Sequence, residues 1–175
     1  MVLNKIQMNK IVTTLVFLLL SSIGFAQSGV VKSTYKAHAE GWLVSIDEAY
    51  ALSKKTGKPI MANFTGTDWC GWCIKLKAEV FDKPEFKEWA KKNVVLLEVD
   101  FPRKKQLPDE IKQQNAGLQQ AFQVQGYPTI WVFNMSKDPK TNQYGIEALG
   151  KTGYVAGGPA NFTKGVDDMI NKGAK

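Results

Sequence analysis

Two cysteines three positions apart are the residues of this sequence best suited to chemistry. They lie in Trp69-Cys70-Gly71-Trp72-Cys73, where an apolar run and a turn give way to a predicted helix. Cys70 at the helix N-terminus would face free N–H groups and the positive end of the helix dipole, which favour a thiolate. Cys73, one turn inside, would be shielded and able to attack a mixed disulfide. The spacing therefore assigns attack to Cys70 and resolution to Cys73.

Three other interpretations of the two cysteines compete with a redox pair. A structural zinc site needs four ligands, and the only histidine, His38, lies in a polar segment that we interpret as solvated. A purely structural disulfide across so short a loop would remove little chain entropy. An unpaired coincidence does not explain the strand-to-helix context. We therefore favour a redox pair and expect no metal.

Length and composition allow one ordinary globular domain. The chain has 175 residues, of which 44% are hydrophobic and 22% are charged. Its formal net charge is +7, but the lysines are spread along the chain among acidic residues, and Arg103 is the only arginine. A solvated lysine-rich surface explains this charge better than nucleic-acid binding does. We expect no nucleic-acid partner.

The N-terminus has the pattern of a secretory signal peptide over residues 1–26. Lys5 and Lys10 precede the short apolar run 11–23, and the small residues Gly24 and Ala26 precede a cleavage site. The run is short for a membrane span, which needs about 20 residues. An uncleaved anchor is the alternative. We expect an exported protein, periplasmic or secreted, with no membrane span after cleavage, in a compartment where disulfides persist.

The mature chain divides into a loose lead-in, 27–41, and one domain, 42–175. Ser45 and Glu48 have the spacing of a capping box, and Gly57 would end that helix. The apolar periodicity and the helix-breaking residues predict helices over 46–55, 70–80, 83–92 and 109–123, and a last helix from 159. They predict strands over 59–64, 94–100, 129–134 and 146–151. The early strands, which are joined through helices, should be parallel, and the last two, joined by a short turn, should be antiparallel. The fold class is α/β, a mixed central sheet with helices on both faces.

These motifs together resemble the thioredoxin superfamily, and within it the exported thioredoxin-like group. The resemblance covers about 42–172. It rests on the Trp-Cys-x-x-Cys motif, on Gly57-Lys58-Pro59-Ile60 before it, and on Gly126-Tyr127-Pro128-Thr129 before a strand. It implies a thioredoxin-like fold, with a sheet of four to five strands. It also implies a cis bond before Pro128, which would pack beside the cysteines.

The sequence departs from thioredoxin at several positions. Gly71-Trp72 replaces the Gly-Pro pair between the cysteines, and Asn63 stands where thioredoxin has a buried proton-transferring Asp. Leu96 stands where a lysine accompanies that Asp. Proton transfer through water, or through Asp68 or Glu98, are the alternatives. The segment 101–117 is longer than in a minimal thioredoxin. We interpret it as a solvated insertion, with a partner-recognition loop as the alternative.

The leading hypothesis is a thiol–disulfide oxidoreductase that reduces disulfides in client proteins through Cys70 and Cys73. Trp69, Gly71, Trp72, Tyr127 and Pro128 would shape the client groove. No organic cofactor is expected, so a second protein must supply electrons, and we expect a monomer. One rival is an oxidase or isomerase, which runs the same chemistry in the other direction. The other is a binding module whose cysteines are idle.

Overall fold

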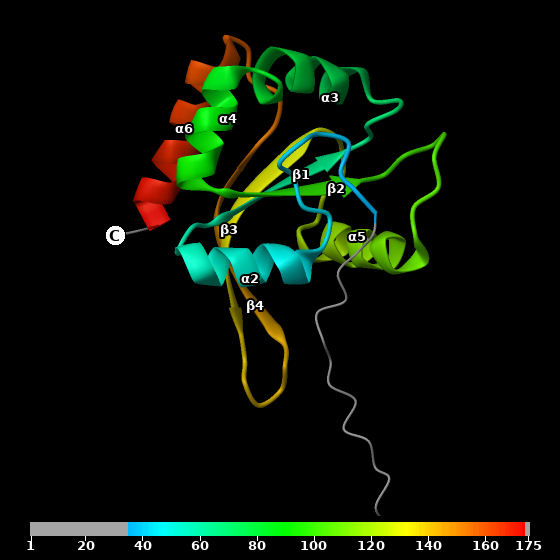
Figure 1. Cartoon of the computed structure of the whole chain (residues 1–175), viewed down its shortest axis with the longest axis vertical. Coiled ribbons are helices and arrows are strands. Elements are labelled where there is room, and N and C mark those ends of the chain that lie inside the picture. Colours follow the sequence, from blue (N-terminus) through cyan, green and yellow to red (C-terminus); the bar gives the residue numbers. More distant parts are fainter. Residues whose placement is uncertain (1–34, 174–175) are drawn as a thin grey trace, which may run out of the picture. The chain divides into compact units, whose positions relative to one another are not determined.

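A computed structural model of the protein describes residues 35–173 (Figure 1). The predicted signal peptide and the first part of the lead-in lie outside the described residues. The element order matches the predicted order. The elements are α2 (Ile46–Thr56), β1 (Ile60–Thr65), α3 (Gly71–Leu76), the π-helical turn η1 (Lys77–Phe81), α4 (Pro84–Asn93), β2 (Val95–Asp100), α5 (Asp109–Ala121), β3 (Thr129–Lys137), β4 (Tyr144–Thr152) and α6 (Gly158–Gly173).

The four strands form one mixed sheet in the order β2-β1-β3-β4. β1 and β2 are parallel, as predicted for strands joined through helices, and β3 and β4 are antiparallel. β1 pairs antiparallel with β3 and is therefore a central strand. All six residues of β1 are buried, which explains why its sequence is an apolar run and does not alternate.

Two hydrophobic clusters cover the two faces of the sheet, and the alternation of β1 decides which residue enters which cluster. Met61 points to the cluster formed with α3, η1, α4 and α6, where Phe86 and Phe162 are fully buried. Ala62 and Phe64 point to the cluster formed with α2 and α5. Figure 1 shows α2 and α5 on the opposite side of the sheet from α3, α4 and α6. The two layers of helices hold β1, and thus the segment that follows it, from both sides.

The first helix begins and ends as its sequence predicts. The hydroxyl oxygen of Ser45 accepts a hydrogen bond from the Glu48 N–H at 3.4 Å. Gly57 adopts a left-handed conformation with φ of 69° and donates its N–H to the Ser53 carbonyl at 2.8 Å. Just before this helix, Leu43 forms a single bridge with β2, and Ala37 and Ala39 pack against the core. The lead-in therefore contacts the domain from residue 35 onward.

The helix after the cysteine motif differs from its prediction. We expected one α-helix over 70–80, whereas α3 ends at Leu76 and continues as the π-helical turn η1. In that turn the Asp82 N–H donates to the Lys77 carbonyl at 2.9 Å, five residues back. The wider turn places Val80 and Phe81 side by side in the core. An apolar periodicity alone does not distinguish such a turn from an α-helix.

The hairpin of β3 and β4 is longer than predicted, because its outer half is a ladder of mostly exposed residues. The strands were predicted over 129–134 and 146–151, with a turn at 136–142. Pairing continues to Lys137 and Tyr144, where the residues are polar or exposed and carry little apolar alternation. Within residues 35–173, no helix has the length and apolar character needed to cross a membrane.

Candidate active site

The turn between β1 and α3 places the cysteine motif at the end of the most buried strand. The Gly66 carbonyl accepts hydrogen bonds from the N–H groups of Trp69, at 3.3 Å, and Cys70, at 2.9 Å. A Cβ at residue 66 would lie 2.5 Å from the Trp69 indole, so glycine is required by this close approach. The turn therefore fixes both the backbone of Cys70 and the ring that precedes it.

Cys70 and Cys73 are joined in a disulfide, with an S–S distance of 2.12 Å. Cys70 is the N-cap of α3, and its sulfur accepts a hydrogen bond from the Cys73 N–H at 3.2 Å. Residue exposures are 6% for Cys70 and 5% for Cys73, so exposure alone does not separate their roles. The difference lies in their surroundings, because Cys70 is the N-cap of a helix and Cys73 lines a cavity that contains polar groups.

The segment with Tyr127 and Pro128 lies beside the motif, and the bond between these two residues is cis, as the resemblance implies. The Tyr127 ring meets the Trp69 ring edge-to-face, with centroids 5.9 Å apart, and stacks on Phe101 at 5.2 Å. Gln119 donates to the Tyr127 hydroxyl at 2.8 Å. Burial raises the pKa of Tyr127, so this ring is a neutral apolar wall at physiological pH.

The two tryptophans of the motif occupy different environments. Trp69 is half-buried and donates its indole N–H to the Phe101 carbonyl at 2.8 Å. Trp72 is 58% exposed and packs on Tyr154, with ring centroids 5.1 Å apart. The ammonium of Lys75 lies over both of those rings, 5.2 Å from the first and 5.1 Å from the second. Trp72 therefore presents an apolar face to solvent next to the disulfide, and Gly71 beside it is exposed.

A cavity of about 290 Å³ lies behind the disulfide and contains polar groups. Its lining includes Cys73, Asn63, Glu98 and Trp42. Asn63 and Glu98 are register partners on β1 and β2, and both are buried. The side-chain oxygen of Asn63 accepts no hydrogen bond from any described residue. Glu98 accepts one hydrogen bond from the His38 backbone N–H at 2.8 Å. The His38 side chain itself is exposed.

Glu98 is a buried carboxyl whose ionisation is disfavoured. Burial, reinforced by repulsion from Asp100, raises the pKa of Glu98 from 4.5 to about 7. The His38 N–H and the ammonium groups of Lys105 and Lys77 act in the opposite direction but do not outweigh burial. A carboxyl with a pKa near 7, in the same cavity as a cysteine sulfur, is suited to accept and return a proton.

Asp68, the other predicted substitute for the missing Asp, has a different function in the structure. Its carboxylate accepts the backbone N–H groups of residues 103, 104 and 105, at 2.9, 2.8 and 3.3 Å. These bonds, with that of Arg103 the strongest, hold the pKa of Asp68 below its usual value. Asp68 is absent from the lining of the cavity behind Cys73. It therefore anchors a loop, and only Glu98 of the two lies where it could serve Cys73.

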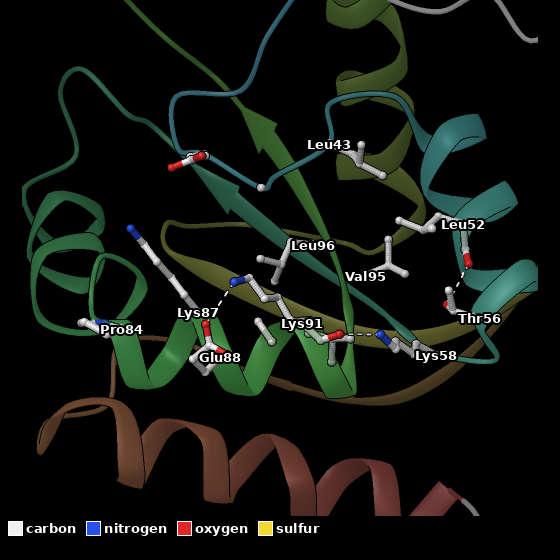
Figure 2. Close-up of a pocket in the computed structure, with 14 residues that line it drawn as sticks. Leu43, Leu52, Thr56, Lys58, Pro84, Lys87, Glu88, Lys91, Val95 and Leu96 are labelled. Carbon is white, nitrogen blue, oxygen red and sulfur yellow. Dashed lines mark hydrogen bonds and ion pairs between the residues drawn. The ribbon is translucent and has the colours of Figure 1, made fainter.

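A second cavity, of about 490 Å³, lies between α2 and α4 along the outer edge of β2 (Figure 2). Leu43, Leu52, Val95 and Leu96 form its apolar wall. Lys91 at its rim pairs with Glu88 at 3.0 Å. No cysteine lines this cavity, so it is separate from the disulfide chemistry. Among residues 35–173, no three His, Cys, Asp or Glu side chains gather as a metal site would require.

The disulfide, the helix that begins at Cys70 and the cis-proline segment beside Trp69 define the class of thioredoxin-like thiol–disulfide oxidoreductases. The model of the thioredoxin-like domain family matches residues 46–146. The chain therefore belongs to this family, and it is a thiol–disulfide oxidoreductase with a Cys-x-x-Cys pair.

Individual relatives agree with this assignment. The chain is 38% identical over 112 residues to "Disulfide bond reductase DsbH" of Chlamydia pneumoniae, covering 64% of this chain and 67% of that protein. It is 32% identical over 89 residues to "Thioredoxin-related protein DsbJ" of the same organism, which is 51% of this chain but 26% of that protein.

Two solved structures superpose on this chain. The structure of "DsbH Oxidoreductase" superposes with a TM-score of 0.64 at 30% identity, over 79% of this chain and 93% of the other. A thioredoxin from Thermus thermophilus superposes with a TM-score of 0.51 at 20% identity, over 73% and 85% of the two chains, and shows the shared fold.

Sequence reasoning missed two features of the site. It did not predict that Arg103 and Phe101 would contact Trp69, or that Tyr154 would pack on Trp72. These contacts join residues more than 30 positions apart, and no local sequence pattern predicts them. The position of Glu98 opposite Asn63 could have been found from the strand register, had that register been known.

Proposed function

We propose that this protein is an exported reductase of disulfides in client proteins. The observation that supports this most is the sulfur of Cys70 at the N-cap of α3, where it already accepts the Cys73 N–H at 3.2 Å. The same N–H and the helix dipole would stabilise a thiolate at Cys70 once the disulfide is reduced. The relative named a disulfide bond reductase supports the direction of electron flow.

In the proposed cycle, the reduced protein begins with two thiols. The Cys70 thiolate attacks one sulfur of a client disulfide, forms a mixed disulfide and releases the other client sulfur as a thiolate, which takes up a proton. Cys73 then attacks the Cys70 sulfur and releases the second client thiolate. Two electrons and two protons pass to the client, and the Cys70–Cys73 disulfide is restored. A separate electron-donor protein reduces it for the next cycle.

Glu98 is our candidate for the proton acceptor of Cys73. The two residues line the same cavity, and the buried oxygen of Asn63 adds a second polar group to that space. Cys73 must lose a proton to attack the mixed disulfide, and a carboxyl with a pKa near the working pH can take it. Asn63, an amide, cannot accept it.

The client groove is proposed from the surfaces around Cys70. Trp72 and Ile74 are exposed large side chains, at 58% and 51%, and would pack on the client segment. The Tyr127 backbone next to Pro128 would bond an extended client strand, and Trp69 and Gly71 would form the floor. We propose monomeric action, because one chain carries both cysteines and the whole cavity behind them.

The reduction potential of the Cys70–Cys73 pair tests the direction of electron flow. Equilibration with glutathione or dithiothreitol buffers should give a value near that of reducing family members, about −270 mV. A value near about −120 mV would instead assign the protein as an oxidase, and about −180 mV would indicate an isomerase. A pair that does not titrate would support an idle binding module. Turnover with insulin as the client tests the activity itself.

A further inference from the structure

The loop 101–108, which follows β2, is fixed against Asp68 and Trp69 and is not a plain solvated insertion. The carboxylate of Asp68, two residues before Cys70, accepts three consecutive backbone N–H groups of this loop. The indole N–H of Trp69 donates to the Phe101 carbonyl. Four hydrogen bonds thus tie the backbone of the loop to the two residues that directly precede Cys70.

This anchoring places the only arginine of the chain on the motif. The guanidinium carbon of Arg103 lies 3.7 Å from the centroid of the Trp69 ring. A stacked guanidinium uses one face for the ring, and its N–H donors around the rim stay available in a fixed plane. Such a group is preorganised to bind a carboxylate through two parallel hydrogen bonds. Lys104, also exposed, adds a second positive charge beside it.

Within residues 35–173, two of the three cations of this loop, Arg103 and Lys104, have no ion pair, whereas the third, Lys105, is paired. The nearby carboxylates are otherwise engaged. Asp68 binds backbone N–H groups, while Asp100 accepts two hydrogen bonds from Thr67 and pairs with Lys105 at 2.8 Å. The exposed cations of the loop are therefore free to bind an anionic partner.

We propose that Arg103 and Lys104 form a selectivity surface that favours client proteins with Asp or Glu next to the target disulfide. This inference rests on the proposed reductase function for the nature of the client. A client carboxylate would bind the rim of the Arg103 guanidinium while the client sulfur meets Cys70. Because Arg103 and Lys104 are both exposed, we expect a modest effect, a preference of about two- to fivefold, which is the size measured for exposed charge pairs.

Three disulfide-bridged fluorogenic peptides test this surface. They differ only in the residues flanking one cysteine, which are Glu, Gln or Lys. Pre-reduced protein, freed of reductant, is mixed with each peptide, and the second-order rate constant of peptide reduction is measured. At low ionic strength the wild type should react about fivefold faster with the Glu peptide than with the Lys peptide. The ratio should approach one at about 1 M salt, where the Debye length is about 3 Å.

Charge-reversal variants locate the effect. Arg103→Glu should bring the Glu-to-Lys rate ratio below one, and Arg103→Gln should bring it near one. The rate with the Gln peptide corrects for any general loss of activity. Lys140→Glu is the matched control, because it changes the net charge equally in the exposed turn between β3 and β4, at the opposite end of the domain from α3 (Figure 1). That variant should keep the wild-type ratio.

The outcomes separate this inference from the proposed function. Equal rates with all three peptides would leave the reductase function standing and overturn the selectivity surface. A Lys140→Glu variant that moves the ratio as far as Arg103→Glu would also overturn it, because the preference would then come from net charge alone. Failure of the wild type to reduce any peptide would refute the reductase function, and the inference would fall with it.

Discussion

Replacing Glu98 by Gln should change how the stability of this protein depends on pH. The substitution keeps the shape of the side chain and an oxygen that can accept the His38 N–H, now at 2.8 Å from the carboxylate. It replaces the ionisable carboxyl by an amide, which neither gains nor loses a proton as the pH changes. Among the groups that act on it, Asp100 repels the carboxylate, and Lys105 and Lys77 attract it. Asp82 also lines the cavity that Glu98 shares with Cys73.

The magnitude follows from the pKa of Glu98, which rises from 4.5 to about 7 on folding. Each pH unit corresponds to about 1.4 kcal/mol, so a rise of about 2.5 pH units corresponds to about 3 kcal/mol. Because the folded pKa is raised, the folded wild type holds this proton more tightly than the unfolded chain does. Below pH 4.5 Glu98 is protonated in both states and does not lower the free energy of unfolding. As the pH rises from 4.5 to about 7, Glu98 lowers this free energy progressively. Above about pH 7 the loss is constant.

Urea unfolding of the oxidised protein between pH 4 and 8.5 measures this effect. The free energy of unfolding of Glu98→Gln, minus that of the wild type, should increase by about 3 kcal/mol between pH 4.5 and 7.5. Glu88→Gln is the control. Glu88 is exposed, and its hydrogen bond from Lys91 lowers its pKa, so this variant should show no such gain with pH. Parallel curves for wild type and Glu98→Gln would refute a raised pKa at Glu98.

Three further predictions concern the cysteines, the turn and the N-terminus. Cys73→Ser should trap a disulfide-linked client on Cys70, whereas Cys70→Ser should trap little, as read on non-reducing gels; equal trapping would contradict the assigned roles. Gly66→Ala should destabilise the protein by about 1–3 kcal/mol in denaturant melts and change Trp69 fluorescence, because the new methyl would lie 2.5 Å from the indole. The helical Gly117→Ala control, where a Cβ meets nothing within 4 Å, should instead stabilise by about 1 kcal/mol. The exported protein should begin at Gln27 by intact mass, and retention of residues 1–26 would exclude the proposed cleavage.

Local signals predicted most of the fold, because each of these elements is encoded within a few neighbouring residues. Ser45 and Gly57 mark the ends of α2, and β1 is mostly apolar because both of its faces are buried. The parallel pairing of β1 and β2 follows from the helices that connect them. The π turn at Lys77–Phe81 was missed, since it preserves an apolar spacing that an α-helix also satisfies.

The sequence predicted only part of the site. It identified residues that lie close together along the chain and missed contacts between distant residues. Cys70 and Cys73 are three residues apart, so their spacing alone implied a pair that a helical turn can bring together. The candidate proton acceptor could not be chosen from the sequence. Asp68 is closer to Cys70 along the chain, but strand pairing brings Glu98 opposite Asn63 and into the cavity of Cys73.

By itself, the sequence determined the redox chemistry and the family, because a Trp-Cys-x-x-Cys motif and a Tyr-Pro segment before a strand are local features of the chain. Only the tertiary structure decided what surrounds the disulfide. Burial in the cavity that it shares with Cys73 gives Glu98 a pKa near 7, and the backbone N–H groups of a basic loop bind the Asp68 carboxylate, which holds this loop against Trp69. A desolvated carboxyl and a stacked guanidinium both depend on groups from distant segments, whose proximity exists only once the sheet has formed.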